Sequence, residues 1–228
     1  MTSAGNSRSL RSIAIPVVAF GIAMGWLEGA VVVYLRAAID PGAAPPAIDP
    51  AAFAWYAPLE VARELATLVM IGAVGWLAGA TKLERLAWAA VVFGIWDIIY
   101  YVTLNIAIAW PATIQDWDVL FLVPAPWVGP VWAPVGVSLA LIGFGLAAAR
   151  QLRMGRSIVA TPRHVGAGLA AGGLVILSFL IDSGRVMAGE TSPWSGWPIY
   201  WAGMVLAVAA ATTALRGAGT DPQRTRHT

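Results

Sequence analysis

The sequence predicts an all-α protein, a polytopic membrane bundle of six transmembrane helices. Hydrophobic residues make up 59% of the 228 residues and charged residues only 11%, and the mean hydropathy is +0.73. This composition is typical of polytopic membrane proteins. Six apolar segments of a length suited to crossing a bilayer follow one another along the chain. Their approximate bounds are 13–35, 58–80, 86–110, 119–149, 165–181 and 194–215.

The basic residues predict the orientation of the bundle. All but three of the 14 Lys and Arg residues fall on the side that the two termini would share, and the exceptions are Arg36, Arg63 and Arg185. Because Lys and Arg accumulate in cytoplasmic loops, we expect cytoplasmic termini and a bacterial-type inner (plasma) membrane. The predicted divisions are a cytoplasmic segment 1–12, a single transmembrane domain 13–215 and a cytoplasmic tail 216–228.

The first predicted helix, 13–35, carries Gly21, Gly25 and Gly29 at four-residue spacing. Such a ridge of small residues lets another helix approach closely. Glu28 lies beside the ridge. It is either a buried carboxyl group held by a neighbour or a working acid.

The segment 37–57 contains Pro-Gly-Ala-Ala-Pro-Pro and predicts an irregular crossing on the outer side, after which Pro58 suits the first turn of the second helix. Glu60 and Arg63 stand three residues apart, which predicts an ion pair at the mouth of this helix. Glu64 lies deeper along the same helix. Because one arginine cannot neutralise two carboxylates, we expect Glu64 to line an internal polar site.

The third predicted helix, 86–110, places Asp97 near the middle of the bilayer, where an ionised carboxylate costs at least ~2.5–3.5 kcal/mol on insertion scales. Tyr101 and Asn105 follow at i+4 and i+8 and therefore share the helix face of Asp97. Three polar groups on one face are unfavourable in contact with lipid. We therefore expect this face to look toward a polar interior to which other helices contribute.

The fourth segment is too rich in proline to be a regular helix. Four prolines fall within eleven positions, namely Pro124, Pro126, Pro130 and Pro134. Each removes a backbone donor and clashes with the preceding turn, so we expect the outer half, 119–134, to be broken, kinked or re-entrant. Irregular backbone at membrane depth is tolerated where it is buried in protein or lines a cavity. Trp127 and Trp132 would then form a wall of the polar interior, and Asp118 either caps this segment or faces the same interior.

The last two segments carry fewer candidate groups. Segment 165–181 is short and contains four glycines, which permit close helix packing. Asp182 and Arg185 follow it at the outer end. Segment 194–215 begins with Trp-Ser-Gly-Trp-Pro-Ile-Tyr-Trp, an aromatic run typical of the membrane interface.

The composition excludes several kinds of chemistry. The chain has no cysteine, which excludes disulfides and thiolate metal sites, and only two histidines, too few for a bis-histidine haem. The only lysine, Lys82, lies in a predicted cytoplasmic loop, which excludes a Schiff base in the core. Carboxylates can hold a hard cation, but the nearby arginines argue against one. We expect no metal, no other cofactor and no nucleic-acid partner.

The segment 96–100, Trp-Asp-Ile-Ile-Tyr, resembles the Trp-Glu-x-x-Tyr element of small integral membrane terpene cyclases, with aspartate where that family tends to have glutamate. The resemblance covers five residues and implies Asp97 as a proton donor, with Glu28 or Glu64 as a second acid. The whole chain also resembles a type of short six-helix bacterial membrane protein, which implies the architecture and no particular activity.

Together these features predict a pocket in the outer half of the bundle, lined by acids and tryptophans, that binds a lipophilic or cationic small molecule. A desolvated carboxylic acid there can protonate an alkene or epoxide while tryptophan faces stabilise the resulting cation. The candidate catalytic residues are Asp97, Glu64 and Glu28, and the candidate binding residues are Glu60, Arg63, Tyr101, Asn105, Asp118, Trp127 and Trp132.

Two other functions stay open at this point, so whether the protein is an enzyme is undecided. A proton- or cation-coupled transporter would need a polar path through both halves of the bundle. A non-catalytic accessory subunit of a membrane complex would have a fully paired acid–arginine network without a cavity. An enzyme would have an enclosed pocket with no path to the cytoplasm. Assembly as a homo-oligomer or within a larger complex fits each of these functions.

Overall fold

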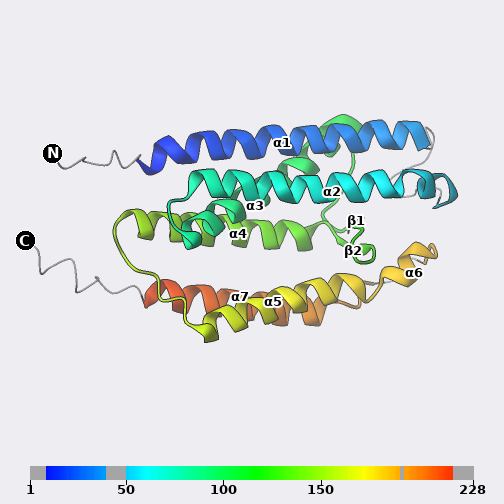
Figure 1. Cartoon of the computed structure of the whole chain (residues 1–228). Helices are drawn as coiled ribbons and strands as arrows, with labels where there is room; N and C mark the ends of the chain where they lie inside the picture. Colours follow the sequence, from blue (N-terminus) through cyan, green and yellow to red (C-terminus); the bar gives the residue numbers. More distant parts are fainter. Residues whose placement is uncertain (1–8, 40–49, 191–192, 218–228) are drawn as a thin grey trace, which may run out of the picture.

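The computed structural model describes residues 9–39, 50–190 and 193–217, which form six long helices, one short helix and a two-stranded hairpin (Figure 1). The elements are α1 (Leu10–Ile39), α2 (Pro50–Ala78), α3 (Lys82–Ile108), β1 (Trp117–Phe121), β2 (Trp127–Pro130), α4 (Trp132–Arg153), α5 (Pro162–Leu180), α6 (Ser183–Met187) and α7 (Trp197–Arg216). Each long helix is apolar and long enough to cross a membrane. The chain is a multi-pass membrane protein, and the expected all-α, six-helix fold is confirmed.

The helices run between two ends of the bundle. α1 begins and α7 ends at the same end, which we name the terminal end (Figure 1). The hairpin β1–β2 and the short helix α6 lie at the opposite end, which we name the hairpin end. An even number of crossings returns the chain to the end where it started.

The central helix of the bundle is α3. Helices α1, α2 and α4 pack against it, whereas α5 packs against α7. The α5–α7 pair joins the rest of the bundle through smaller contacts of α7 with α4 and of α5 and α6 with β2. In Figure 1 this pair forms a separate layer, and within the described residues no extensive contact joins α2 to α5 or α7.

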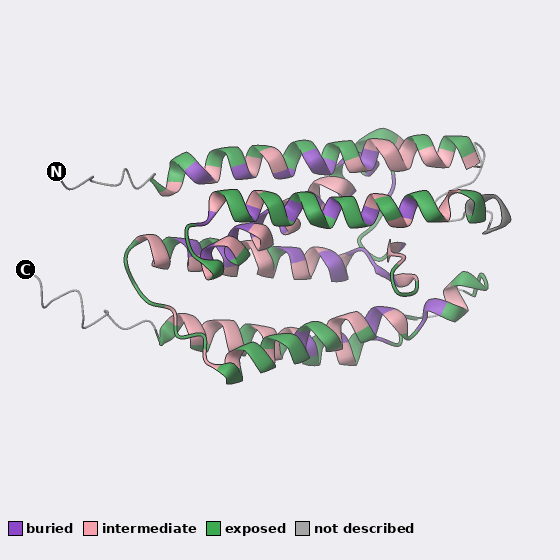
Figure 2. Ribbon diagram, viewed as in Figure 1, coloured by how far each residue is buried: buried purple, intermediate pink, exposed green. Residues whose placement is uncertain are grey.

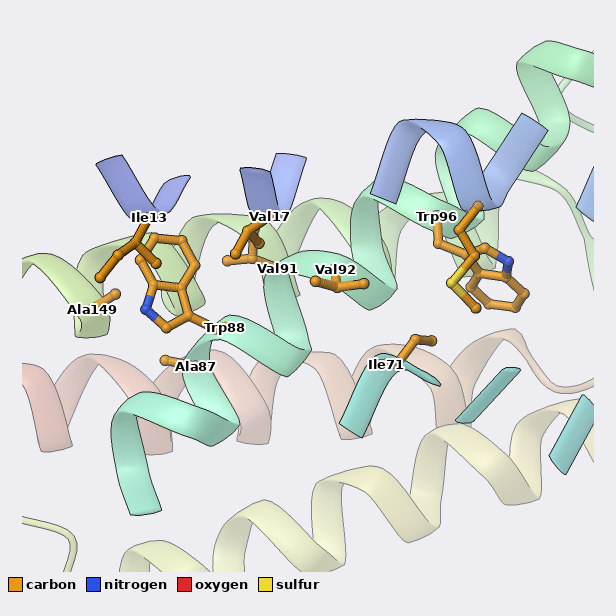
Figure 3. Close-up of a cluster of buried hydrophobic side chains, with 10 residues drawn as sticks. Ile13, Val17, Ile71, Ala87, Trp88, Val91, Val92, Trp96 and Ala149 are labelled. Carbon is orange, nitrogen blue, oxygen red and sulfur yellow. The ribbon is translucent and has the colours of Figure 1, made fainter. Parts of the chain in front are cut away.

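A cluster of buried apolar side chains joins α1, α2, α3 and α4 (Figure 3). Trp88, Val91 and Val92 of α3 are fully buried in it. Its other members are Ile13, Val17, Met24, Ile71, Ala87, Trp96 and Ala149. On the outer faces of the helices, large apolar side chains such as Trp76 and Leu77 are exposed instead, as suits contact with lipid (Figure 2).

The glycine ridge of α1 packs directly on α3, as expected. A Cβ atom at Gly25 would lie 2.6 Å from the carbonyl oxygen of Trp96, and one at Gly29 would lie 2.7 Å from Cβ of Thr103. Any larger residue would therefore push the two helices apart. This close approach fixes the height of Asp97 relative to α1, because Trp96 is its immediate neighbour in the chain.

The second helix begins earlier than expected. α2 begins at Pro50, so part of segment 37–57 is helical and Pro58 lies inside the helix. Pro50 suits a first helical turn as well as Pro58 does, which is why the pattern did not separate them. The rest of that crossing and most of the predicted terminal segments lie outside the described residues, in 40–49, 1–8 and 218–228.

The proline-rich region is not helical, as expected, but it forms a β-hairpin that the sequence pattern did not predict. β1 pairs antiparallel with β2, and Val119 lies opposite Val128. Residues 122–126 connect the strands, so two of the prolines occupy the turn, where no ladder hydrogen bond is lost. α4 begins at Trp132, earlier than expected. Pro134 is tolerated because it falls in the first turn, where a backbone N–H would have no acceptor within the helix.

At the terminal end, one buried glutamate holds the α2–α3 connection, α3 and α4 together. Glu84 is 3% exposed and accepts hydrogen bonds from the Ala80 N–H (2.9 Å) and from Trp88 Nε1 (3.4 Å). Its Oε1 also lies 2.5 Å from Nε of Arg153 on α4. We name these four residues the Glu84 clasp.

Candidate functional site

A cavity of about 720 Å³ lies between the α3–α4 side of the bundle and the α5–α7 pair. It extends from Arg36 at the hairpin end to Leu215 at the terminal end, so it is not confined to the outer half of the bundle as the sequence predicted. All of its charged residues lie toward the hairpin end and at the middle of α3, and its lining toward the terminal end is apolar. Leu86 of α3 and Gly172 of α5 border the cavity and are themselves exposed, so the cavity opens onto the side of the bundle.

The structure brings eight of the ten candidate residues to this one cavity. They come from α1, α2, α3 and the hairpin, and they are Glu28, Glu60, Arg63, Glu64, Asp97, Tyr101, Asp118 and Trp127. Residues that lie far apart in the sequence thus surround a common space. Their functional roles stay predictions.

Asn105 and Trp132 do not line the cavity. Asn105 is exposed, and its amide donates to the carbonyl of Pro111 (2.8 Å), because α3 has already passed the cavity by this turn. Trp132 packs its ring against Trp194 (5.4 Å) and Tyr200 (5.2 Å) between ring centroids. The expected ligand-orienting role of Asn105 and wall role of Trp132 therefore have no place at the cavity.

A three-residue charged group joins α1 to α2 at the hairpin end of the cavity. Nε of Arg63 donates to Glu60 (2.9 Å), which confirms the expected ion pair within α2. Arg63 also forms an ion pair with Glu28 of α1, and the Thr67 hydroxyl donates to the other oxygen of Glu28 (3.4 Å). One guanidinium group thus faces two carboxyl groups, so Glu28 and Glu60 are occupied by it.

Glu64 connects α2 to the hairpin. Both of its carboxyl oxygens lie 3.1 Å from the backbone nitrogen of Leu122, which donates to them just after β1 ends. Glu64 has no ion pair among the described residues, although Arg63 is its neighbour in the chain. It therefore holds the hairpin against α2 and forms part of the cavity wall toward the hairpin end.

Asp97 is held by a single hydrogen bond. The Ser138 hydroxyl of α4 donates to it at 2.8 Å, and no arginine or lysine forms an ion pair with it within the described part of the chain. Ser138 itself is fully buried, whereas Asp97 is half-buried because it borders the cavity. The carboxyl group thus faces the cavity at the middle of the membrane-spanning part of α3.

Asp118 of β1 is buried beside α3 and lies outside the membrane-spanning helices. It accepts a hydrogen bond from the Tyr101 hydroxyl (3.1 Å). Burial raises the pKa of Asp118 to about 6, against the opposing effects of the Arg36 charge and of this hydrogen bond. The carboxyl group does not cap α4, which begins with no side-chain cap.

Aromatic rings line the cavity next to Asp97. Trp96 lies at 5.3 Å from Phe93 and at 6.2 Å from Phe121 between ring centroids, and Phe121 lies at 5.3 Å from Trp127. All four rings border the cavity. We name Phe93, Trp96, Phe121 and Trp127 the aromatic wall. Such faces attract a cation and also stack on planar groups.

Sequence reasoning missed two residues of the site. Ser138, the hydrogen-bond partner of Asp97, was detectable as a single hydroxyl residue in an otherwise apolar helical stretch at membrane depth. Arg36, which also lines the cavity, was recognised in the sequence only as one of the three basic residues on the side away from the termini. In both cases the polar residue itself could be seen in the sequence. Its place beside the cavity could not, because that depends on how α4 and α1 pack against α3.

No family model matches this chain, and neither does a curated protein or a solved structure. Within residues 9–39, 50–190 and 193–217, no group of three or more His, Cys, Asp or Glu side chains is arranged to hold a metal ion. The chemistry of the cavity is therefore argued from its own residues.

Proposed function

We propose that the protein binds a lipophilic small molecule in this cavity and acts on it by acid catalysis, with Asp97 as the proton donor. The carrying observation is a mid-membrane carboxyl group that borders a cavity, holds one hydroxyl partner and forms no ion pair within the described residues. An ionised carboxylate in this place is costly, so the group carries a proton that it can transfer. General acids of this kind contribute about 10²–10⁴-fold to rate.

The proposed step conserves atoms and charge. The Asp97 carboxyl transfers its proton to a carbon–carbon double bond, whose π electrons form the new C–H bond and leave a carbocation. The faces of the aromatic wall stabilise this cation. Loss of a proton from a neighbouring carbon to the Asp97 carboxylate restores the acid, and the substrate leaves as an isomer or a cyclised product.

The resemblance to membrane terpene cyclases supports this proposal. Trp96, Asp97 and Tyr100, the three residues that carry the resemblance, all line the cavity. In this arrangement Glu28 is occupied by Arg63 and Glu64 by the hairpin backbone. We therefore assign both a positioning role and leave proton transfer to Asp97.

The alternative functions fit the cavity less well. A proton- or cation-coupled carrier needs polar groups along both halves of its path, and toward the terminal end the lining is apolar, with residues such as Leu83, Ile158 and Leu215. An accessory subunit with a purely structural acid–arginine network has no need of a cavity of about 720 Å³. These observations favour a site for a lipophilic substrate.

The binding part is tested with two neighbouring glycines of α5. A side chain added at Gly172 or at Gly173 would meet nothing within 4 Å at its Cβ, but only Gly172 lines the cavity. Gly172→Phe should abolish co-purification of a lipophilic molecule, measured by mass spectrometry of a solvent extract, while Gly173→Phe should retain it. Equal extracts from both variants would reject the cavity as the binding site.

The catalytic part is tested at Asp97. Purified protein is incubated with a lipid extract of its host membranes, and products are separated by chromatography and identified by mass. Asp97→Asn should reduce turnover by at least about 100-fold, and Asp97→Glu, which keeps the carboxylic acid, should retain part of it. Unchanged turnover in Asp97→Asn would end the catalytic role without affecting the binding result.

We place the protein in a bacterial-type inner membrane with the terminal end in the cytoplasm, on the basis of its basic residues. The absence of native cysteine allows a direct test. Ile114 at the hairpin end and Met154 at the terminal end are both exposed. A membrane-impermeant maleimide should label Ile114→Cys on intact cells and should leave Met154→Cys unlabelled until the membrane is opened.

A further inference from the structure

The cavity continues well past Asp97 toward the terminal end. Along α3 its lining reaches Leu83, which stands about 21 Å from Asp97 at the helical rise of about 1.5 Å per residue. Along α4 it reaches Ala148, which stands about 15 Å beyond Ser138, the hydrogen-bond partner of Asp97. A stretch of about 15–21 Å therefore lies between Asp97 and the terminal end of the cavity. We name this stretch the apolar extension.

The lining of the apolar extension suits hydrocarbon only. No polar side chain among the described residues lines it, and many of its lining residues are small. Six of these small residues belong to α3, α4 and α7, and they are Ala87, Ala90, Ala148, Ala207, Ala211 and Ala214. A polar group of a ligand would lose its water here without gaining a side-chain partner, whereas a hydrocarbon chain gains dispersion contacts that an empty space forfeits.

The cavity is also long for its volume. Its lining on α3 runs from Leu83 to Tyr101, about 27 Å of helix, so a volume of about 720 Å³ corresponds to a mean cross-section of roughly 27 Å². Because apolar carbon atoms pack at about 3.5–4.0 Å from one another, a space of this width accommodates one extended hydrocarbon chain. Two chains side by side need more width.

Helix α7 borders the apolar extension along its length. α4 and α7 both run from the hairpin end to the terminal end, and the Tyr200 hydroxyl of α7 donates to the Ala133 carbonyl of α4 (2.8 Å) (Figure 1). Ser138 follows Ala133 by just over one turn, so Met204, one turn after Tyr200, lies near the level of Asp97.

Three alanines of α7 follow Met204 on the same face at intervals of three or four residues, and all line the cavity. Ala207 lies nearest to the level of Asp97, Ala211 lies about 11 Å beyond Met204, and Ala214 lies about 15 Å beyond it. A larger side chain at each position would close the apolar extension at a different distance from Asp97.

We propose that the apolar extension holds a single extended hydrocarbon chain, so that the protein selects linear lipophiles long enough to reach from Asp97 to the terminal end. Ala207, Ala211 and Ala214 set the chain length that fits. This inference rests on the proposed binding of a lipophilic molecule in the cavity and specifies the shape of that molecule. The reacting double bond lies beside Asp97, and the chain lies between α3, α4 and the α5–α7 pair.

The test compares two uncharged linear 1-alkenes, of ten and of sixteen carbons, each with a photoreactive diazirine at the far end of the chain. With carbon–carbon bonds of about 1.5 Å, an extended sixteen-carbon chain covers the apolar extension and a ten-carbon chain ends near Ala211. The full chain in nanodiscs is illuminated with each probe, and the mass of the intact protein gives the fraction that carries one adduct. Labelling of Gly172→Phe, in which the cavity is blocked, is subtracted as background.

The sixteen-carbon probe should label the unsubstituted protein at least about threefold more than the ten-carbon probe, because its additional carbons gain contacts with the wall. Equal labelling by the two probes, or stronger labelling by the shorter one, would overturn the proposal.

Substitutions on α7 give a second readout. Ala211→Phe should abolish the preference for the longer probe, and Ala207→Phe should reduce labelling by both probes. Ala209→Phe is the matched control, since Ala209 is exposed and does not line the cavity, and it should keep the preference. Ala214→Phe, which should reduce labelling by the longer probe alone, replaces Ala211→Phe if that variant does not fold. The same preference in the cavity variants as in Ala209→Phe would show that these alanines do not set the length.

Failure of this inference is distinguishable from failure of the proposed function. If Gly172→Phe removes labelling by both probes while the α7 variants keep the preference of the unsubstituted protein, the cavity is a lipophile site and the placement of the chain is wrong. If Gly172→Phe is labelled as strongly as the unsubstituted protein by both probes, the cavity is not the site and both proposals fall.

Discussion

Two acids on α3, the buried Glu84 and the half-buried Asp97, differ in how many hydrogen-bond and ion-pair partners the protein gives them. Glu84 accepts two hydrogen bonds from N–H groups and pairs with Arg153, and it does not line the cavity. Asp97 accepts one hydrogen bond, from Ser138, and borders the cavity. A carboxylate has about four acceptor positions. Most of those on Glu84 are used for structure, and most of those on Asp97 remain available.

The difference separates a structural acid from a candidate working acid within one helix. A buried ion pair with all its hydrogen bonds holds helices together and has little freedom to exchange a proton. An acid with a single neutral partner beside a cavity contributes little to packing. The comparison predicts that substitutions at the two positions have opposite consequences for stability and activity.

The largest effect is expected at the Glu84 clasp. Glu84→Met removes the acceptor of three donors and one half of a buried ion pair, and it should lower the free energy of unfolding by about 3–5 kcal/mol. Chemical unfolding of the protein in detergent micelles measures this change. A loss below about 1 kcal/mol would show that the clasp is not structural, and the comparison would no longer hold.

Asp118 should make the stability pH-dependent. Its pKa of about 6 in the folded protein lies above the value of about 3.9 in an unfolded chain, so the folded state binds the proton more tightly. The stabilisation is fully present below about pH 4 and is lost as the pH rises through about 6, with a span of roughly 3 kcal/mol. Asp118→Asn should flatten this part of the profile of unfolding free energy against pH, because its amide oxygen still accepts from Tyr101. A profile that keeps the full slope in the variant would contradict the assignment.

A smaller effect is expected at Ser138. Ser138→Ala removes the one donor to Asp97 and should lower the free energy of unfolding by about 0.5–1.5 kcal/mol. Turnover should change as well, because the carboxyl group loses the contact that fixes its orientation. Ser178→Ala is a matched control, since Ser178 is equally buried but donates to the carbonyl of Val175 within its own helix. Equal changes in turnover for both variants would show that Ser138 has no special connection to Asp97.

The smallest effect on stability is expected at Asp97 itself. Asp97→Asn keeps an oxygen that accepts from Ser138 and should change the free energy of unfolding by less than about 1 kcal/mol. Thermal unfolding beside Glu84→Met provides the direct comparison. If Asp97→Asn unfolded as easily as Glu84→Met, both acids would be structural and the distinction between them would be lost.

Much of the fold could be predicted because lipid imposes a simple rule on each segment. A spanning helix must be apolar over about 20 residues, so hydropathy alone located all six membrane-spanning helices. Pro124 and Pro126 indicated the break before α4 in the same local way. The pairing of β1 with β2 could not be predicted, because its register depends on two segments meeting, and no local pattern encodes that meeting.

The site was predictable to the extent that ionisable groups at membrane depth must avoid lipid. Asp97, Glu64 and Glu28 lie on three different helices and all reach one cavity. The helical spacing that linked Asn105 to Asp97 failed because the cavity does not extend to the end of α3. Glu84 was overlooked because it stands at the start of a helix, where acids are common for reasons of capping and dipole.

Among the described residues, α2 makes no extensive contact with α5 or α7, and this arrangement affects how a ligand reaches the cavity. Because Leu86 and Gly172 at the rim are exposed on the flank of the bundle, a hydrophobic guest can reach the cavity sideways from the hydrocarbon phase without crossing water. For the lipophilic ligand that we propose, occupancy would depend on its mole fraction among the lipids, and its aqueous solubility would have little influence. The bilayer itself acts as the reservoir.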